Sequence, residues 1–294
     1  MSIPDLAVEI VKTTTDSSDE NARTIILVGS KSAGKSTLLH IFLEKTDVPK
    51  ETLVLEYSFG RKSSQKQSIE KTICHVWEYG GRLEMLKHVL SSIPVQGACY
   101  FCVVLDLSKI KGLWNTLEIC VQVMIDNYKD AASLPELIIV GGKYDLFKNY
   151  DSEIKKCICT TIRSFALLHD ANIIFYSSQE TQLVKKAKDM FNNIGFGNGV
   201  MLKEKNTNFN KPLLIPKGFD TWENIGYPAS TVEQIKERHF SRIAPEAKIK
   251  EDIKLLPRSH PEPILDSLAA LKYEELRNMD LYDPCIDNYL SLLQ

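Results

Sequence analysis

Short apolar runs alternate with longer segments of helical periodicity between residues 24 and 195. Each run has the length of a buried strand, and each longer segment repeats apolar residues at helical spacing. We therefore predict six strands, at residues 24–28, 53–59, 72–78, 99–106, 136–141 and 172–177. Five helices are predicted at residues 35–45, 83–90, 108–127, 151–169 and 179–193.

A complete phosphate-binding pattern, G-x-x-x-x-G-K-[ST], connects the first predicted strand to the first predicted helix. The glycines let successive N–H groups converge on phosphate oxygens, and the helix N-terminus adds its positive dipole end. In such a loop, Lys35 reaches the terminal phosphates and Ser36 ligates Mg²⁺. The predicted nucleotide-binding residues are Gly29, Ser30, Lys31, Ser32, Ala33, Gly34, Lys35, Ser36 and Thr37.

The order of the predicted elements defines the fold class. The second and third strands follow one another without a helix between them, so they form an antiparallel hairpin. The other connections contain helices and imply right-handed parallel crossovers. We therefore expect an α/β fold, a Ras-like P-loop G domain. Its six-stranded, mostly parallel sheet carries helices on both faces, and a helical C-terminal extension follows.

Composition divides the chain into three parts. We predict an N-terminal helix and polar linker in residues 1–22 and the Ras-like domain in residues 23–197. The C-terminal extension is predicted to comprise residues 198–294. Within the extension we expect a short edge strand at 212–216 and amphipathic helices at 264–279 and 286–293. The apolar stripes of these helices either dock on a partner chain or pack back on the protein's own sheet.

The charge balance limits the possible partners. The 294-residue chain has a net charge of −2, which argues against nucleic-acid and membrane-surface binding. No secretory signal is visible, and no apolar run reaches the roughly 20 residues that span a bilayer. Seven cysteines in apparent core segments suit reduced thiols in the cytosol. Cys99 and Cys102 should point to opposite faces of their strand, and the six histidines form no metal-binding pattern.

A base-reading loop is expected after the fifth strand, at Gly142-Lys143-Tyr144-Asp145. Asp145 is suited to accept the guanine N–H donors, and Lys143 to lie along the ring. Gly142 stands where an Asn would brace the loop, which weakens the preference for guanine. The alternative is an ordinary polar loop in which Asp145 caps a helix.

The positions that support hydrolysis and switching are altered. Glu78 stands near the place of the metal-holding Asp of D-x-x-G, and Arg82 follows the glycines where a water-positioning Gln is common. The loop at residues 46–51 is short, and Thr52 is its best candidate metal ligand. Asp106 is predicted to cap the following helix rather than hold Mg²⁺. We expect GDP or GTP with Mg²⁺ to be a structural ligand, or the loop to be empty.

Together these motifs resemble the dynein light intermediate chain family. The resemblance is carried by residues 29–36, 52–62, 76–81, 103–108 and 142–145, and it continues through 210–213, 218–220 and 225–226. The later stretch and the compact length are closest to the cytoplasmic dynein-2 branch. The resemblance implies a non-catalytic subunit that binds and stabilises the dynein-2 heavy chain.

The resemblance also implies a role in retrograde intraflagellar transport and cilium assembly, with other dynein-2 subunits and the transport machinery as partners. The implied location is the cytoplasm, the cytoskeleton and the cilium, including its base and axoneme. Two other functions stay open from the residues themselves. One is a regulatory GTPase with weak guanine-nucleotide binding and slow hydrolysis. The other is a P-loop ATPase or kinase that uses Asp106 on Mg²⁺.

Overall fold

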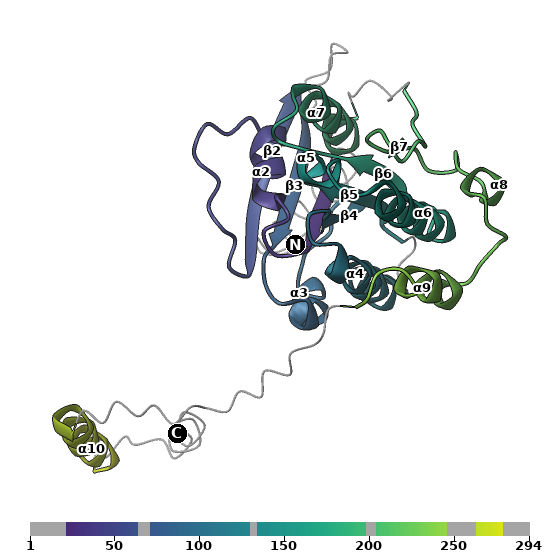
Figure 1. The fold of residues 1–294 in the computed structure, drawn as a ribbon. Helices are drawn as coiled ribbons and strands as arrows, with labels where there is room; N and C mark the ends of the chain where they lie inside the picture. The colour runs from purple at the N-terminus through teal and green to yellow at the C-terminus, as the bar shows by residue number, and fades with distance from the viewer. Residues whose placement is uncertain (1–21, 64–70, 130–133, 198–203, 246–262, 279–294) are drawn as a thin grey trace. The chain divides into compact units, whose positions relative to one another are not determined.

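A seven-stranded sheet organises the larger part of the protein (Figure 1). The computed structural model describes residues 22–63, 71–129, 134–197, 204–245 and 263–278. The strands run in the spatial order β2-β3-β1-β4-β5-β6-β7. They are β1 (Ala22–Gly29), β2 (Leu55–Ser63), β3 (Lys71–Tyr79), β4 (Ala98–Asp106), β5 (Glu136–Gly142), β6 (Asn172–Phe175) and β7 (Leu214–Ile215).

The strand pairing confirms the predicted Ras-like fold. β1 lies parallel between β3 and β4, and β5 and β6 continue the parallel run. β2 pairs antiparallel with β3, which is the predicted hairpin. The seventh strand, β7, lies antiparallel to β6 and comes from the extension, within the predicted edge strand at 212–216. Pro212 and Pro216 flank it, and proline is tolerated there because the end of an edge strand needs no N–H donor for a further strand.

Helices cover both faces of the sheet, as predicted (Figure 1). α2 (Lys35–Phe42) and α7 (Thr181–Phe196) pack on one face. α3 (Leu86–Leu90), α4 (Leu113–Tyr128), α6 (Ser152–Leu168) and α9 (Val232–Phe240) contribute to the other. Alternation along the strands explains the two layers, since Ile26 and Val28 of β1 face one side and Ile25 and Leu27 the other.

Several predicted boundaries differ from the observed ones. α2 ends at Phe42 rather than residue 45, because Glu44 has a left-handed backbone (φ 54°) that stops a helix. The helices predicted at 83–90 and 108–127 each begin with a 3₁₀ turn, at Leu83–Met85 and Ile110–Gly112. α5 (Tyr144–Phe147), α8 (Trp222–Ile225) and α9 were missed. α5 and α8 are too short to show periodicity.

Other predictions fall in the ends of the chain. Contacts divide the chain into two units, Met1–Glu246 and Ala247–Gln294. In the second unit α10 (Pro263–Arg277) forms where a helix at 264–279 was predicted. The predicted helices in 1–22 and 286–293 lie outside the described residues. No helix in the described ranges combines the length and apolarity needed to span a bilayer.

The cysteines of the described ranges are free thiols, and they are buried or half-buried. Cys102 is buried in the cluster under α2 and α7, while Cys99 borders the cluster on the opposite face. This confirms that the two sulfur atoms lie on opposite sides of β4. No group of three potential metal-binding His, Cys, Asp or Glu side chains occurs in the described parts of the chain.

A buried ion pair fastens the extension to α6. Arg163 Nε and Nη2 donate to the two oxygens of Asp220 at 2.6 and 2.7 Å, and both side chains are at most 10% exposed. Arg163 Nη2 also donates to Asn224 O at 3.2 Å, and Nη1 to Thr207 O at 3.4 Å. A bidentate pair with further acceptors satisfies the buried guanidinium. One side chain therefore holds three points of the extension.

Replacing Asp220 with alanine should lower the free energy of unfolding by about 3–5 kcal/mol, because Arg163 would stay buried without its partner. Urea denaturation followed by circular dichroism measures this loss. The matched control is Lys217→Ala, which breaks an exposed ion pair with Asp170 at 2.7 Å and leaves the left-handed backbone of Asp170 (φ 50°) unchanged. The control should cost less than about 1 kcal/mol. Equal losses in the two variants would contradict the anchoring role of Arg163.

Candidate functional site

The predicted phosphate loop joins β1 to α2 and lies against the end of β4. Gly29 has φ +131°, and a Cβ there would overlap the carbonyl of Val104. The Ser30 N–H donates to that same carbonyl at 3.1 Å. Gly34 (φ +95°) then places the chain at the start of α2. Both positions favour glycine because other residues rarely adopt these angles, and Gly29 also approaches β4 too closely to carry a side chain.

The lysine and the serine of the loop make internal contacts. Lys35 is 5% exposed, and its Nζ donates to Ser30 O at 2.8 Å. Ser36 Oγ donates to Glu78 Oε1 at 2.6 Å. Burial lowers the pKa of Lys35, and the charge of Glu78 opposes this. Burial raises the pKa of Glu78, opposed by the Ser36 hydrogen bond and the Lys35 charge. The Lys35 and Glu78 charges therefore offset only part of the effect of burial on each other's pKa.

Three oxygen-bearing side chains meet beside the loop. Ser36, Thr52 and Glu78 all line a cavity of about 260 Å³, together with the loop residues from Lys31 to Thr37. Thr52 is 4% exposed and donates to Glu56 Oε2 at 3.1 Å. Hydroxyl and carboxylate oxygens are the ligands that Mg²⁺ prefers. The structure thus brings the loop together with Thr52, the candidate metal ligand, and Glu78, which stands near the place of the metal-holding Asp.

The short loop before β2 closes one side of this cavity. Glu51 Oε1 lies 3.2 Å from Lys31 Nζ, an exposed ion pair between this loop and the phosphate loop. Gly80 lies against Thr52, where a Cβ would overlap the Thr52 carbonyl. Among the described residues that line the cavity there is neither Gln nor His. Arg82, which stands where a water-positioning Gln is common, accepts a hydrogen bond from Tyr79 Oη through its backbone carbonyl at 2.5 Å.

Lys143 and Asp145 lie apart from the phosphate cavity and do not line it. Lys143 has a left-handed backbone (φ 59°) just before α5, and its Nζ lies 2.8 Å from Asp106 Oδ2. Asp145 Oδ1 accepts a hydrogen bond from Ser177 Oγ at 2.6 Å. Gly142 brings this loop to the phosphate loop, since a Cβ there would lie 2.5 Å from Ala33 O. The base-side and phosphate-side residues therefore meet at Gly142 and Ala33.

Two partners on the base side were missed by sequence reasoning. Ser177 follows β6 and fixes the orientation of the Asp145 carboxylate. Its signal in the sequence is a Ser at the carboxyl end of a parallel strand, where side chains of neighbouring strands meet. Asp106 was expected to cap the next helix, and this prediction is wrong. Its Oδ1 accepts from Ser108 N at 3.0 Å and its Oδ2 from Lys143, while Lys109 is the N-cap of the 3₁₀ turn.

These features define the class of protein: a phosphate loop after β1, a hairpin after the first helix and a polar loop after β5 form a Ras-like G domain. No family model matches the chain. A cytoplasmic dynein 2 light intermediate chain 1 of Danio rerio is 33% identical over 303 residues, covering 86% of this chain and 84% of that protein. The Homo sapiens protein of the same name is 32% identical over 73% of this chain and 71% of its own length.

The chain therefore belongs to the cytoplasmic dynein 2 light intermediate chain family, as the resemblance indicated. A septum-promoting GTP-binding protein of Schizosaccharomyces pombe is 23% identical over 54% of this chain and 77% of that protein. Among solved structures, the conserved domain of a dynein light intermediate chain matches with a TM-score of 0.46 and 13% identity, over 74% of this chain and 89% of that one.

The buried carboxyl of Glu78 should make stability depend on pH. Burial raises the folded-state pKa of this carboxyl above its ordinary value of 4.5, so the native state keeps a proton that the unfolded chain releases. The free energy of unfolding of the wild type, relative to Glu78→Gln, should therefore fall as the pH rises from about 4.5 to about 7. Urea denaturation across this range measures the difference. The matched control is Glu84→Gln, which changes an exposed carboxylate. If the free energy of unfolding of the wild type minus that of Glu78→Gln stays constant or grows with pH, the raised pKa of Glu78 is refuted.

Proposed function

We propose that the protein is a non-catalytic accessory subunit of the cytoplasmic dynein 2 motor. It binds and stabilises the heavy chain and thereby supports retrograde intraflagellar transport and cilium assembly. The observation that carries this proposal is the identity of 33% over most of the chain to a dynein 2 light intermediate chain. The proposed locations are the cytoplasm, the cytoskeleton and the cilium, including its base and axoneme. Other dynein-2 subunits and transport proteins are the further partners proposed.

α10 supplies a surface suited to the heavy chain. Leu265, Leu268 and Leu271 are each more than half exposed, and Ile264 is 76% exposed. Their spacing places them on one side of the helix, because residues three and four apart share a face. An amphipathic helix of this kind binds by laying its apolar side against a groove or helix of a partner. We therefore assign the heavy chain as the partner of this stripe.

The double variant Leu268→Asp/Leu271→Asp should reduce co-purification of the full chain with the heavy chain by about tenfold or more, because it places two charges in an apolar contact. Co-expression with the heavy-chain tail and quantitative immunoblotting measure the yield. Ala270→Asp is the control, since it adds a charge on the opposite side of the same helix. If the double variant co-purifies the heavy chain at an undiminished yield, this stripe is not the surface that binds the heavy chain.

We further propose that the phosphate loop holds GDP or GTP with Mg²⁺ as a structural ligand. The residues fit such a ligand, with Gly29–Thr37 around the phosphates, Ser36 toward the metal, and Lys143 and Asp145 toward the base. Nucleotide that binds only the folded state stabilises it by mass action. Switching is disfavoured by the short loop before β2, because residues 46–51 leave little chain to close over a γ-phosphate.

A second candidate, a regulatory GTPase, is favoured by one observation. The Ser177 bond holds the Asp145 carboxylate in a fixed orientation, as a base-reading group requires. Chromatography of the protein after denaturation identifies any bound nucleotide, and single-turnover assays with GTP measure hydrolysis. A structural role predicts guanine nucleotide that is lost in Lys35→Ala, with GTP turnover about tenfold or more below the roughly 4 × 10⁻⁴ s⁻¹ intrinsic rate of a small G protein. Turnover comparable to that intrinsic rate and abolished by Lys35→Ala would instead establish the regulatory GTPase.

A further inference from the structure

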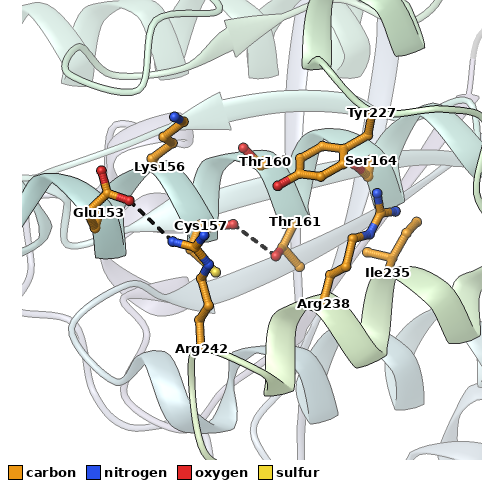
Figure 2. A pocket seen from close by; sticks show the side chains of 10 residues that line it. All are labelled: Glu153, Lys156, Cys157, Thr160, Thr161, Ser164, Tyr227, Ile235, Arg238 and Arg242. Carbon is orange, nitrogen blue, oxygen red and sulfur yellow. Dashed lines mark hydrogen bonds and ion pairs between the residues drawn. The ribbon is translucent and has the colours of Figure 1, made fainter.

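A small polar pocket lies between α6 and α9, away from the phosphate loop (Figure 2). Its volume is about 80 Å³. α6 contributes one wall, the loop after α8 contributes Tyr227, and α9 with the turn after it contributes the other wall. We propose that this pocket binds a phosphate monoester carried on a serine or threonine of a partner polypeptide.

Positive charge dominates the pocket. Lys156, Arg238 and Arg242 line it, against the single carboxylate of Glu153. Arg242 Nη1 lies 3.2 Å from Glu153 Oε2, but both side chains are at least 60% exposed, so the pair is weak and easily exchanged. The chain as a whole has a net charge of −2. A local excess of cations in such a chain favours an anionic ligand at this place.

Arg238 is held in place with a donor to spare. Its guanidinium carbon lies 4.4 Å from the centroid of the Tyr227 ring, and its Nε donates to Gln234 O at 3.2 Å. Its Nη2 is buried and finds no acceptor among the described residues. Figure 2 shows this guanidinium beside the Tyr227 ring. A buried charged donor without an acceptor costs free energy, and an oxyanion in the pocket would remove that cost.

Hydroxyl groups complete a lining suited to an oxyanion. Thr160, Ser164 and Tyr227 contribute hydroxyls that make no hydrogen bond within the described residues. The volume is several times the roughly 10–15 Å³ that one water requires, and well below the roughly 300 Å³ of the smallest usual ligand pockets. A tetrahedral group with several oxygens matches this size. The group that bears the phosphate must therefore lie outside, on the surface.

The three cations of the pocket also indicate the charge of the ligand, and the charge of the chain indicates which kind of molecule carries it. A phosphate monoester carries about −1.5 to −2 at neutral pH, which suits three cations better than a carboxylate does. Clusters of Arg and Lys are a recurring means of binding phosphorylated side chains. A lipid headgroup would place the surrounding surface against an anionic membrane, which the negative net charge of the chain disfavours. A phosphorylated polypeptide is therefore the favoured ligand.

Cys157 gives a local readout, because it lines the pocket as a half-buried free thiol. The probe is N-acetyl-O-phosphoserine amide at up to about 20 mM, since a single small group binds at millimolar strength. Alkylation of the full chain by iodoacetamide is followed by mass spectrometry at each cysteine. The probe should slow modification of Cys157 about fivefold through occupancy of the charged pocket. Half-buried Cys99, on β4, is the internal reference and should react at an unchanged rate.

Variants separate this site from general phosphate attraction and from the phosphate loop. Lys156→Gln/Arg242→Gln should abolish the protection of Cys157, while Lys155→Gln, on the same helix but outside the pocket, should retain it. Equal protection in both variants, or no protection of the wild type, would overturn the proposal. Equal protection by N-acetylserine amide or N-acetylglutamate amide would overturn the choice of phosphate. Protection by phosphoinositide vesicles without protection by the phosphoserine probe would overturn the choice of a polypeptide.

Discussion

The buried pair of Arg163 and Asp220 determines how the second half of the protein is built. A charge taken out of water is tolerated only while its partner and its remaining hydrogen bonds are present. Arg163 meets this condition by binding Asp220, Asn224 and Thr207, which belong to separate points of the extension. β7, α8 and α9 can then pack beside β6, α6 and α4. α9 adds contacts of its own, since Ile235 and His239 are buried and Lys236 pairs with Glu118 of α4 at 2.7 Å.

Close backbone contacts preserve the G-domain shape where catalytic groups have changed. The phosphate loop meets β4 at Gly29, the loop after β3 meets Thr52 at Gly80, and the base-side loop meets the phosphate loop at Gly142. Each contact excludes a Cβ, so it depends on glycine. The altered hydrolytic positions lie within this frame. A structural role for the domain is thus compatible with an intact phosphate loop.

Local patterns predicted the fold better than they predicted the site. Six strands, the hairpin and the phosphate loop all rest on contiguous residues, whose periodicity or spacing is visible in the sequence. The contacts of Asp106 with Lys143 and of Asp145 with Ser177 join residues 37 and 32 positions apart. The sequence shows that these residues lie at strand ends but not which of them pair, so Asp106 was assigned wrongly and Ser177 was missed. α9 had a local signal, the capping box of Thr231 and Gln234, that would have located it.

The two edges of the sheet differ in how they limit pairing with other chains. β2 forms one edge over nine residues, and Arg61 and Lys62 place charge near its end. β7 forms the other edge with two residues between prolines. Natural sheets resist edge-to-edge pairing by placing charged side chains on a long edge strand, or by keeping the edge strand short and adding proline. Each edge of the sheet therefore carries a feature that disfavours pairing with the sheet of a neighbouring copy of the domain.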